Sequence, residues 1–101
     1  MQNITAEELK QRIDNGEQLN IVDVREPHER AEFNIGGIHV PLGHVQAMQV
    51  DELEELKDKE VIVYCRSGNR SGQACMLLET MGFTNVKNLT GGMLKWQELY
   101  K

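Results

Sequence analysis

The sequence has few cysteines and no long apolar run. Two cysteines in 101 residues are too few for the disulfide framework of a small secreted domain, and neither lies in a Cys-x-x-Cys pair. Its purely apolar runs, such as residues 61–63, are far shorter than the roughly 20 residues of a membrane-spanning helix. The first residues lack the charged start and apolar stretch of a secretory signal. We therefore expect a cytoplasmic protein with no membrane partner.

Positive charge is also scarce. Eleven Lys and Arg residues stand against sixteen Asp and Glu, a formal charge of -5, which argues against a nucleic-acid partner. His28, His39 and His44 lack metal-ligand spacing with cysteines or carboxylates, so we expect no metal site and no cofactor. A chain with 40% hydrophobic residues suits one hydrophobic core, and we expect a single domain over residues 1–101.

Strand and helix patterns alternate along the chain. Thr5 and Glu8 form a capping-box pattern, and the apolar spacing that follows predicts a helix ending at Gly16. The predicted strands are 19–24, 38–40, 60–64 and 86–89, and further helices are expected from about 26, 51 and 71 and over 93–100. This alternation predicts an α/β fold with a mainly parallel central sheet of four to five strands.

Cys65 directly follows the strongest predicted strand, residues 60–64. Its nearly continuous run of apolar residues is typical of a central strand buried on both faces of a parallel sheet. Ligands of such folds collect at the carboxyl ends of the strands. A short loop containing Gly68, ahead of a helix near Ser71, can turn several backbone N–H groups toward one anion.

The same loop favours a thiolate at Cys65. The N–H groups, the positive helix end and the guanidinium groups of Arg66 and Arg70 all stabilise negative charge, and reactive cysteines in such surroundings have pKa values of about 3.5 to 7.5. Two positive residues in a short loop of an acidic protein also predict small anionic substrates. Cys75 lies beside the apolar stripe of the following helix, so we interpret it as a core residue.

Four stretches match, in order, the motifs of a known family: 21–27, 36–41, the Cys65 loop with its strand, and 91–96 with the pattern Gly-Gly-x-x-x-Trp. Over nearly its whole length the chain thus resembles the rhodanese family. The resemblance implies a rhodanese-like three-layer sandwich. It also marks Asp23, Arg25 and Glu32 as structural residues, which we interpret as an ion pair that fixes the first crossover.

The resemblance further implies a thiosulfate sulfurtransferase. In this family a thiolate takes the outer sulfur of a small anionic donor, thiosulfate or a persulfide, and a thiophilic acceptor, a protein or a small thiol, removes it from the cysteine persulfide. Covalent catalysis of this kind needs an activated thiolate and fixed donors around it. By position, Cys65 is the expected nucleophile, and the expected substrate-binding residues are Arg66, Ser67, Gly68, Asn69 and Arg70.

Two other functions fit parts of the pattern. Cysteine-based phosphatases and arsenate reductases carry Cys, five residues and then Arg, whereas Arg70 follows Cys65 after four and Ser71 occupies the phosphatase Arg position. The shorter loop favours a sulfur atom over a phosphoryl group. A persulfide carrier or docking module without turnover of its own remains open, because such a module would have the same loop.

Overall fold

The computed structural model describes residues 1–100. Five strands alternate with five α-helices and one 3₁₀ helix, η1. In chain order they are β1 Gln2–Ile4, α1 Ala6–Asp14, β2 Ile21–Asp23, α2 Pro27–Glu32, β3 Ile38–His39, α3 Leu42–Gln46, η1 Asp51–Leu56, β4 Glu60–Tyr64, α4 Asn69–Thr80, β5 Asn85–Leu89 and α5 Gly92–Leu99. The predicted alternation is confirmed.

The strands form one parallel sheet in the order β1-β5-β4-β2-β3. β4 is the central strand, as its apolar sequence predicts, and pairs with β2 and β5. Along β4, Val61 and Val63 contribute to one core cluster and Ile62 and Tyr64 to the other, which is the two-residue alternation of a strand. A residue that directly follows β4 therefore lies at the centre of the row formed by the carboxyl ends of the strands.

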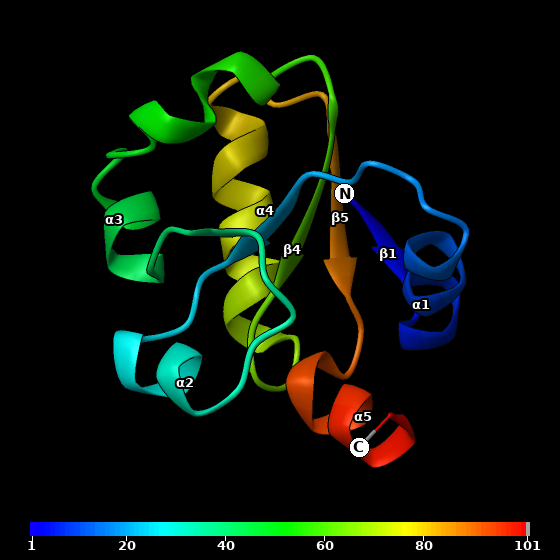
Figure 1. Cartoon of the computed structure of the whole chain (residues 1–101). Coiled ribbons are helices and arrows are strands. Elements are labelled where there is room, and N and C mark those ends of the chain that lie inside the picture. Colours follow the sequence, from blue (N-terminus) through cyan, green and yellow to red (C-terminus); the bar gives the residue numbers. More distant parts are fainter. Residues whose placement is uncertain (101) are drawn as a thin grey trace.

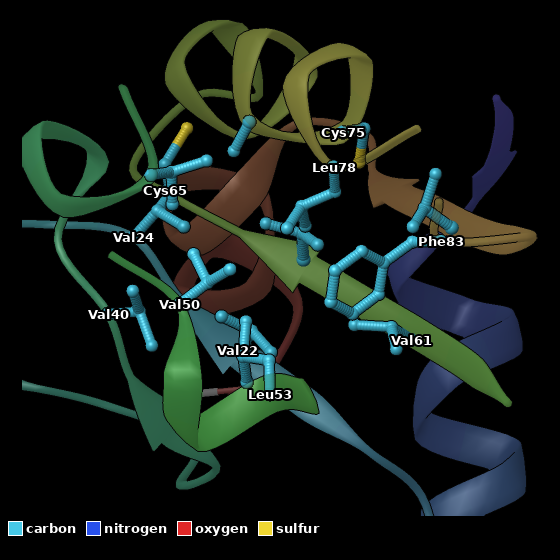
Figure 2. Close-up of a cluster of buried hydrophobic side chains, with 14 residues drawn as sticks. Val22, Val24, Val40, Val50, Leu53, Val61, Cys65, Cys75, Leu78 and Phe83 are labelled. Carbon is cyan, nitrogen blue, oxygen red and sulfur yellow. The ribbon is translucent and has the colours of Figure 1, made fainter. Parts of the chain in front are cut away.

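Helices cover both faces of this sheet (Figure 1). One core cluster joins the sheet to α3, η1 and α4 (Figure 2); its buried members include Val22, Val45, Leu53, Val63, Cys65, Cys75 and Leu78. The other joins it to α1 and α5 through Leu9, Tyr64, Met93 and Trp96, among others. The arrangement is the predicted three-layer sandwich.

Three short elements differ from the sequence expectation. β1 was not predicted, because two of its three residues are exposed polar side chains and its pairing with β5 carries the strand. The short helix α3 was also missed. Residues 51–56 form the 3₁₀ helix η1, in which Leu53 is the buried residue. All three depend on distant contacts that local patterns do not report.

The helices are short. Within residues 1–100, none has both the length and the hydropathy needed to cross a bilayer. The longest, α4, has 12 residues.

Candidate functional site

The Cys65 side chain points from the carboxyl end of β4 toward the start of α4 (Figure 2). Its Sγ accepts a hydrogen bond from the Gly68 amide at 3.1 Å and from the Ser71 amide at 3.3 Å. The Ser71 hydroxyl oxygen also lies 3.3 Å from Sγ. The predicted cradle of N–H groups is therefore present, and its centre is the sulfur atom itself.

Gly68 gives the loop its shape. Its φ of 105° lies in the left-handed region, which glycine adopts without strain, and α4 begins at the next residue. A Cβ here would lie 3.5 Å from the Gly91 nitrogen, an ordinary contact. The backbone conformation, rather than a lack of space, therefore requires glycine and turns the Gly68 amide toward Cys65.

The start of α5 holds the backbone of the Cys65 loop through hydrogen bonds. The amide of Met93 donates to the carbonyl oxygen of Cys65, and the amide of Leu94 donates to that of Arg66, both at 2.9 Å. A Cβ on Gly92 would lie 2.4 Å from the Cys65 oxygen. The Gly-Gly pair of the C-terminal motif thus allows a helix N-terminus to contact the backbone of the Cys65 loop.

These contacts perturb the pKa of Cys65. Burial raises it, whereas hydrogen bonds from the Ser71 side chain and from the backbone amides of Ser71, Gly68 and Ser67 lower it, and the net pKa lies below that of an ordinary cysteine. For Cys75 burial acts without such donors and raises the pKa to about 12. The hydrogen bonds at Cys65 thus favour its charged form, whereas Cys75 is a buried core residue, as predicted.

The two loop arginines differ. Arg70 donates two hydrogen bonds to Glu29 of α2, at 2.7 and 2.8 Å, and these bonds lower the Glu29 pKa to about 2. Arg66 is exposed on the loop. The interpretation that both guanidinium groups face the anion is thus modified, because Arg70 already holds a carboxylate.

The other predicted loop residues contribute mainly backbone. Ser67 and Asn69 are exposed, and the Ser67 amide is among the groups that lower the Cys65 pKa. Sequence reasoning did not assign Ser71 to the site; it placed this residue at the helix start and at the position of the phosphatase Arg. It also missed Asn88 of β5, whose side chain contacts Ser71 and Gly68. No spacing rule links Asn88 to the loop, because the contact depends on how β5 packs.

The predicted ion pair at the first crossover is present between Asp23 and Arg25. Both are buried, and Arg25 donates two side-chain bonds to the Asp23 carboxylate, at 2.9 and 3.0 Å. The expectation for Glu32 was wrong: it is exposed and forms none of the ion pairs of residues 1–100. Arg30 lies 3.3 Å from Asp23 instead, because the turn of α2 directs residue 30, and not residue 32, toward β2.

A three-layer α/β fold with a cysteine in an N–H cradle at the end of its central strand defines a class of thiol-dependent domains. The family model of the rhodanese-like domain matches residues 5–99. The chain belongs to this family.

Its relatives include sulfurtransferases. A sulfurtransferase of Allochromatium vinosum is 39% identical over 94 residues, covering 92% of this chain and 85% of the relative. YrkF of Bacillus subtilis, which has the provisional name of a sulfur carrier protein, is 40% identical over 94 residues. The chain spans about half of that relative's length, 49%.

Solved structures of the family have the same fold. The crystal structure of a rhodanese-like domain protein from Staphylococcus aureus superposes with a TM-score of 0.81 at 30% identity, covering 95% of this chain and 91% of that one. The predicted rhodanese-like architecture is confirmed.

Proposed function

We propose that this chain, as one domain, is a sulfurtransferase whose nucleophile is Cys65. The observation that carries the proposal is the convergence of the Gly68 and Ser71 amides on Cys65 Sγ. Fixed N–H donors stabilise a thiolate without any reorganisation of solvent. The proposed donor is a small sulfur anion such as thiosulfate or a persulfide, and the proposed acceptor is a protein or small thiol.

The reaction balances in two steps. The Cys65 thiolate attacks the outer sulfur of thiosulfate, a new S–S bond forms, and the S–S bond of the donor breaks with its electron pair leaving on sulfite. The charge then lies on the outer sulfur of a Cys65 persulfide. An acceptor thiolate attacks that sulfur, the S–S bond to Cys65 breaks, and Cys65 leaves as a thiolate. Kinetics of the ping-pong type follow from the covalent intermediate.

A carrier function is the second candidate, since YrkF is named provisionally as a sulfur carrier. A carrier would form the same persulfide but would release its sulfur only to a particular partner. Phosphatase activity has less support, because Arg70 is bonded to Glu29 and Ser71 occupies the phosphatase Arg position. Cytoplasmic location stays a prediction from the sequence.

The intact mass of the protein after incubation with thiosulfate tests the proposal. We expect a gain of one sulfur atom that is absent in Cys65→Ala and present in the matched control Cys75→Ser, which changes the other cysteine. Cyanide should then remove the sulfur as thiocyanate. A mass increase that persists in Cys65→Ala, or no increase at all, would refute the proposal. Persulfide formation without multiple turnovers on small thiols would favour the carrier.

A further inference from the structure

Two buried polar side chains lie next to the nucleophile and belong to elements distant in sequence. Ser71 of α4 is fully buried and Asn88 of β5 is 9% exposed. The Ser71 oxygen lies within hydrogen-bond distance of two atoms, Cys65 Sγ and Asn88 Oδ1. A hydroxyl group has one proton, so it donates to only one of them at a time.

The orientation of the Asn88 amide decides which of these two atoms accepts the Ser71 hydrogen bond. Its Nδ2 donates to the carbonyl oxygen of Gly68 at 3.1 Å. The reversed amide would place Oδ1 against that carbonyl oxygen, two acceptors with no donor between them. Oδ1 therefore faces Ser71 and can only accept, so when Cys65 is a thiol the Ser71 hydroxyl donates its hydrogen bond to Asn88 Oδ1. In that state the Ser71 oxygen offers Cys65 a lone pair, which suits a thiol S–H and does not stabilise a thiolate.

We propose that Asn88 competes with Cys65 for the hydrogen bond of the Ser71 hydroxyl. Ser71 and Asn88 are then positioning residues, which set how strongly the loop stabilises charge on Sγ. When Cys65 is a thiolate, the hydroxyl turns to Sγ. The inference rests on the proposed function only for its place in the sulfur-transfer cycle. In the persulfide, Sγ is bonded to two atoms and is neutral, and the hydroxyl returns to Asn88. It turns again when Cys65 becomes the leaving group.

Ser71 and Asn88 carry no charge, but ionisable groups also act on Cys65. From α4, Arg70 and Cys75 interact with it electrostatically. Arg70 is bonded to Glu29 of α2, so the charge of α2 acts on the site through this ion pair. The pKa of Cys75 is raised to about 12 by burial, so it stays neutral at assay pH. Within the described residues, a change in the Cys65 titration between variants that keep it buried therefore reports mainly the hydrogen bonds at Sγ.

A double-mutant cycle tests the competition. The rate of Cys65 alkylation by iodoacetamide is measured against pH in the full chain, with the modified peptide identified by mass. Ser71→Ala removes the donor and should move the midpoint up by about one pH unit, since a hydrogen bond to a charged group is worth about that much. Asn88→Ala should lower the midpoint when Ser71 is present, because the hydroxyl is then free to donate to Sγ. In the Ser71→Ala background no hydroxyl can be released, so the same change should have a smaller lowering effect.

The comparison of the Asn88→Ala effect with and without Ser71 distinguishes the proposed competition from a general loosening of the Cys65 loop. Loss of the Asn88 bond to Gly68 loosens the loop equally in both backgrounds, so equal midpoint changes overturn the proposal, as does an unchanged midpoint in Ser71→Ala. If Asn88→Ala does not fold, Asn88→Asp replaces it at almost the same shape. Its carboxylate attracts the Ser71 proton more strongly, so its midpoint should rise more when Ser71 is present than in Ser71→Ala; equal rises count against the proposal.

Two controls complete the experiment. Thr80→Ala removes another hydroxyl from α4, at its far end, where Thr80 donates to the Leu77 carbonyl, and should leave the midpoint unchanged. Alkylation needs no sulfur donor. The cycle therefore gives its answer even if no persulfide forms on Cys65, and failure of the sulfurtransferase proposal is distinguishable from failure of this one.

Discussion

The ion pair between Arg70 and Glu29 should reduce the affinity of the site for anionic donors. Glu29→Gln keeps the side chain's shape and removes its negative charge, which leaves the Arg70 charge uncompensated. Removing one negative charge from the neighbourhood of a dianion in a water-accessible site gains about 1 kcal/mol. That corresponds to a roughly fivefold lower half-saturating thiosulfate concentration.

The effect on stability has the opposite sign. The Glu29 pKa falls from 4.5 to about 2, chiefly through the Arg70 hydrogen bonds, which would correspond to ~3 kcal/mol if the whole fall counted. The Arg70 side chain is 32% exposed and that of Glu29 16%, so solvent screening reduces this to about 1 to 2 kcal/mol. Glu29→Gln should therefore bind thiosulfate more tightly in a less stable protein.

The assay is single-turnover persulfide formation at varied thiosulfate concentration, together with urea unfolding. Arg70→Ala should raise the half-saturating concentration, because it leaves the Glu29 charge uncompensated, and adding Glu29→Gln should bring it back toward the wild-type value. The folded-state pKa of about 2 means that Glu29 is charged throughout pH 6 to 8, so the ratio between variants should not change there. An unchanged half-saturating concentration in Glu29→Gln would refute the reasoning.

Two further predictions concern the fold. Gly92→Ala should slow Cys65 alkylation and lower the urea midpoint, since the new Cβ would lie 2.4 Å from the Cys65 oxygen; normal values of both would contradict the packing argument. Arg12 and Lys87 lower the Glu60 pKa to about 2, so Glu60 stabilises the fold above its unfolded pKa and loses that effect as pH falls through about 2. Glu60→Gln should cost ~1 to 2 kcal/mol at pH 7 and almost nothing near pH 2 by urea unfolding, and a difference independent of pH would count against it.

The parts of the fold that were predicted from the sequence are those governed by local patterns. The capping box at Thr5 and Glu8 is present in both directions, because both partners lie within one helical turn. β4 was predicted from its apolar run, and the position of Cys65 followed from the rule that sites lie at the carboxyl ends of parallel strands. Each of these inferences needs only neighbouring residues and one general property of α/β folds.

The contacts that were missed join distant parts of the chain. Arg70 and Glu29 are 41 positions apart, and Asn88 is 17 positions from Ser71. Charge alone marks Arg70 as an anion binder, but only the tertiary fold shows that the Glu29 carboxylate already occupies it. The fold was thus more predictable than the electrostatics of its site, because a few long-range contacts decide those.

The support that α5 gives to the Cys65 loop has a consequence for protein synthesis. The amides that hold the Cys65 and Arg66 carbonyls belong to Met93 and Leu94, so a growing chain on the ribosome contains Cys65 before it contains the groups that hold its loop. Until those residues emerge, the Cys65 and Arg66 carbonyl groups lack the hydrogen bonds that α5 donates. The same holds for a chain cleaved after Thr90, so the hydrogen bonds that hold the Cys65 loop are complete only in protein that contains α5.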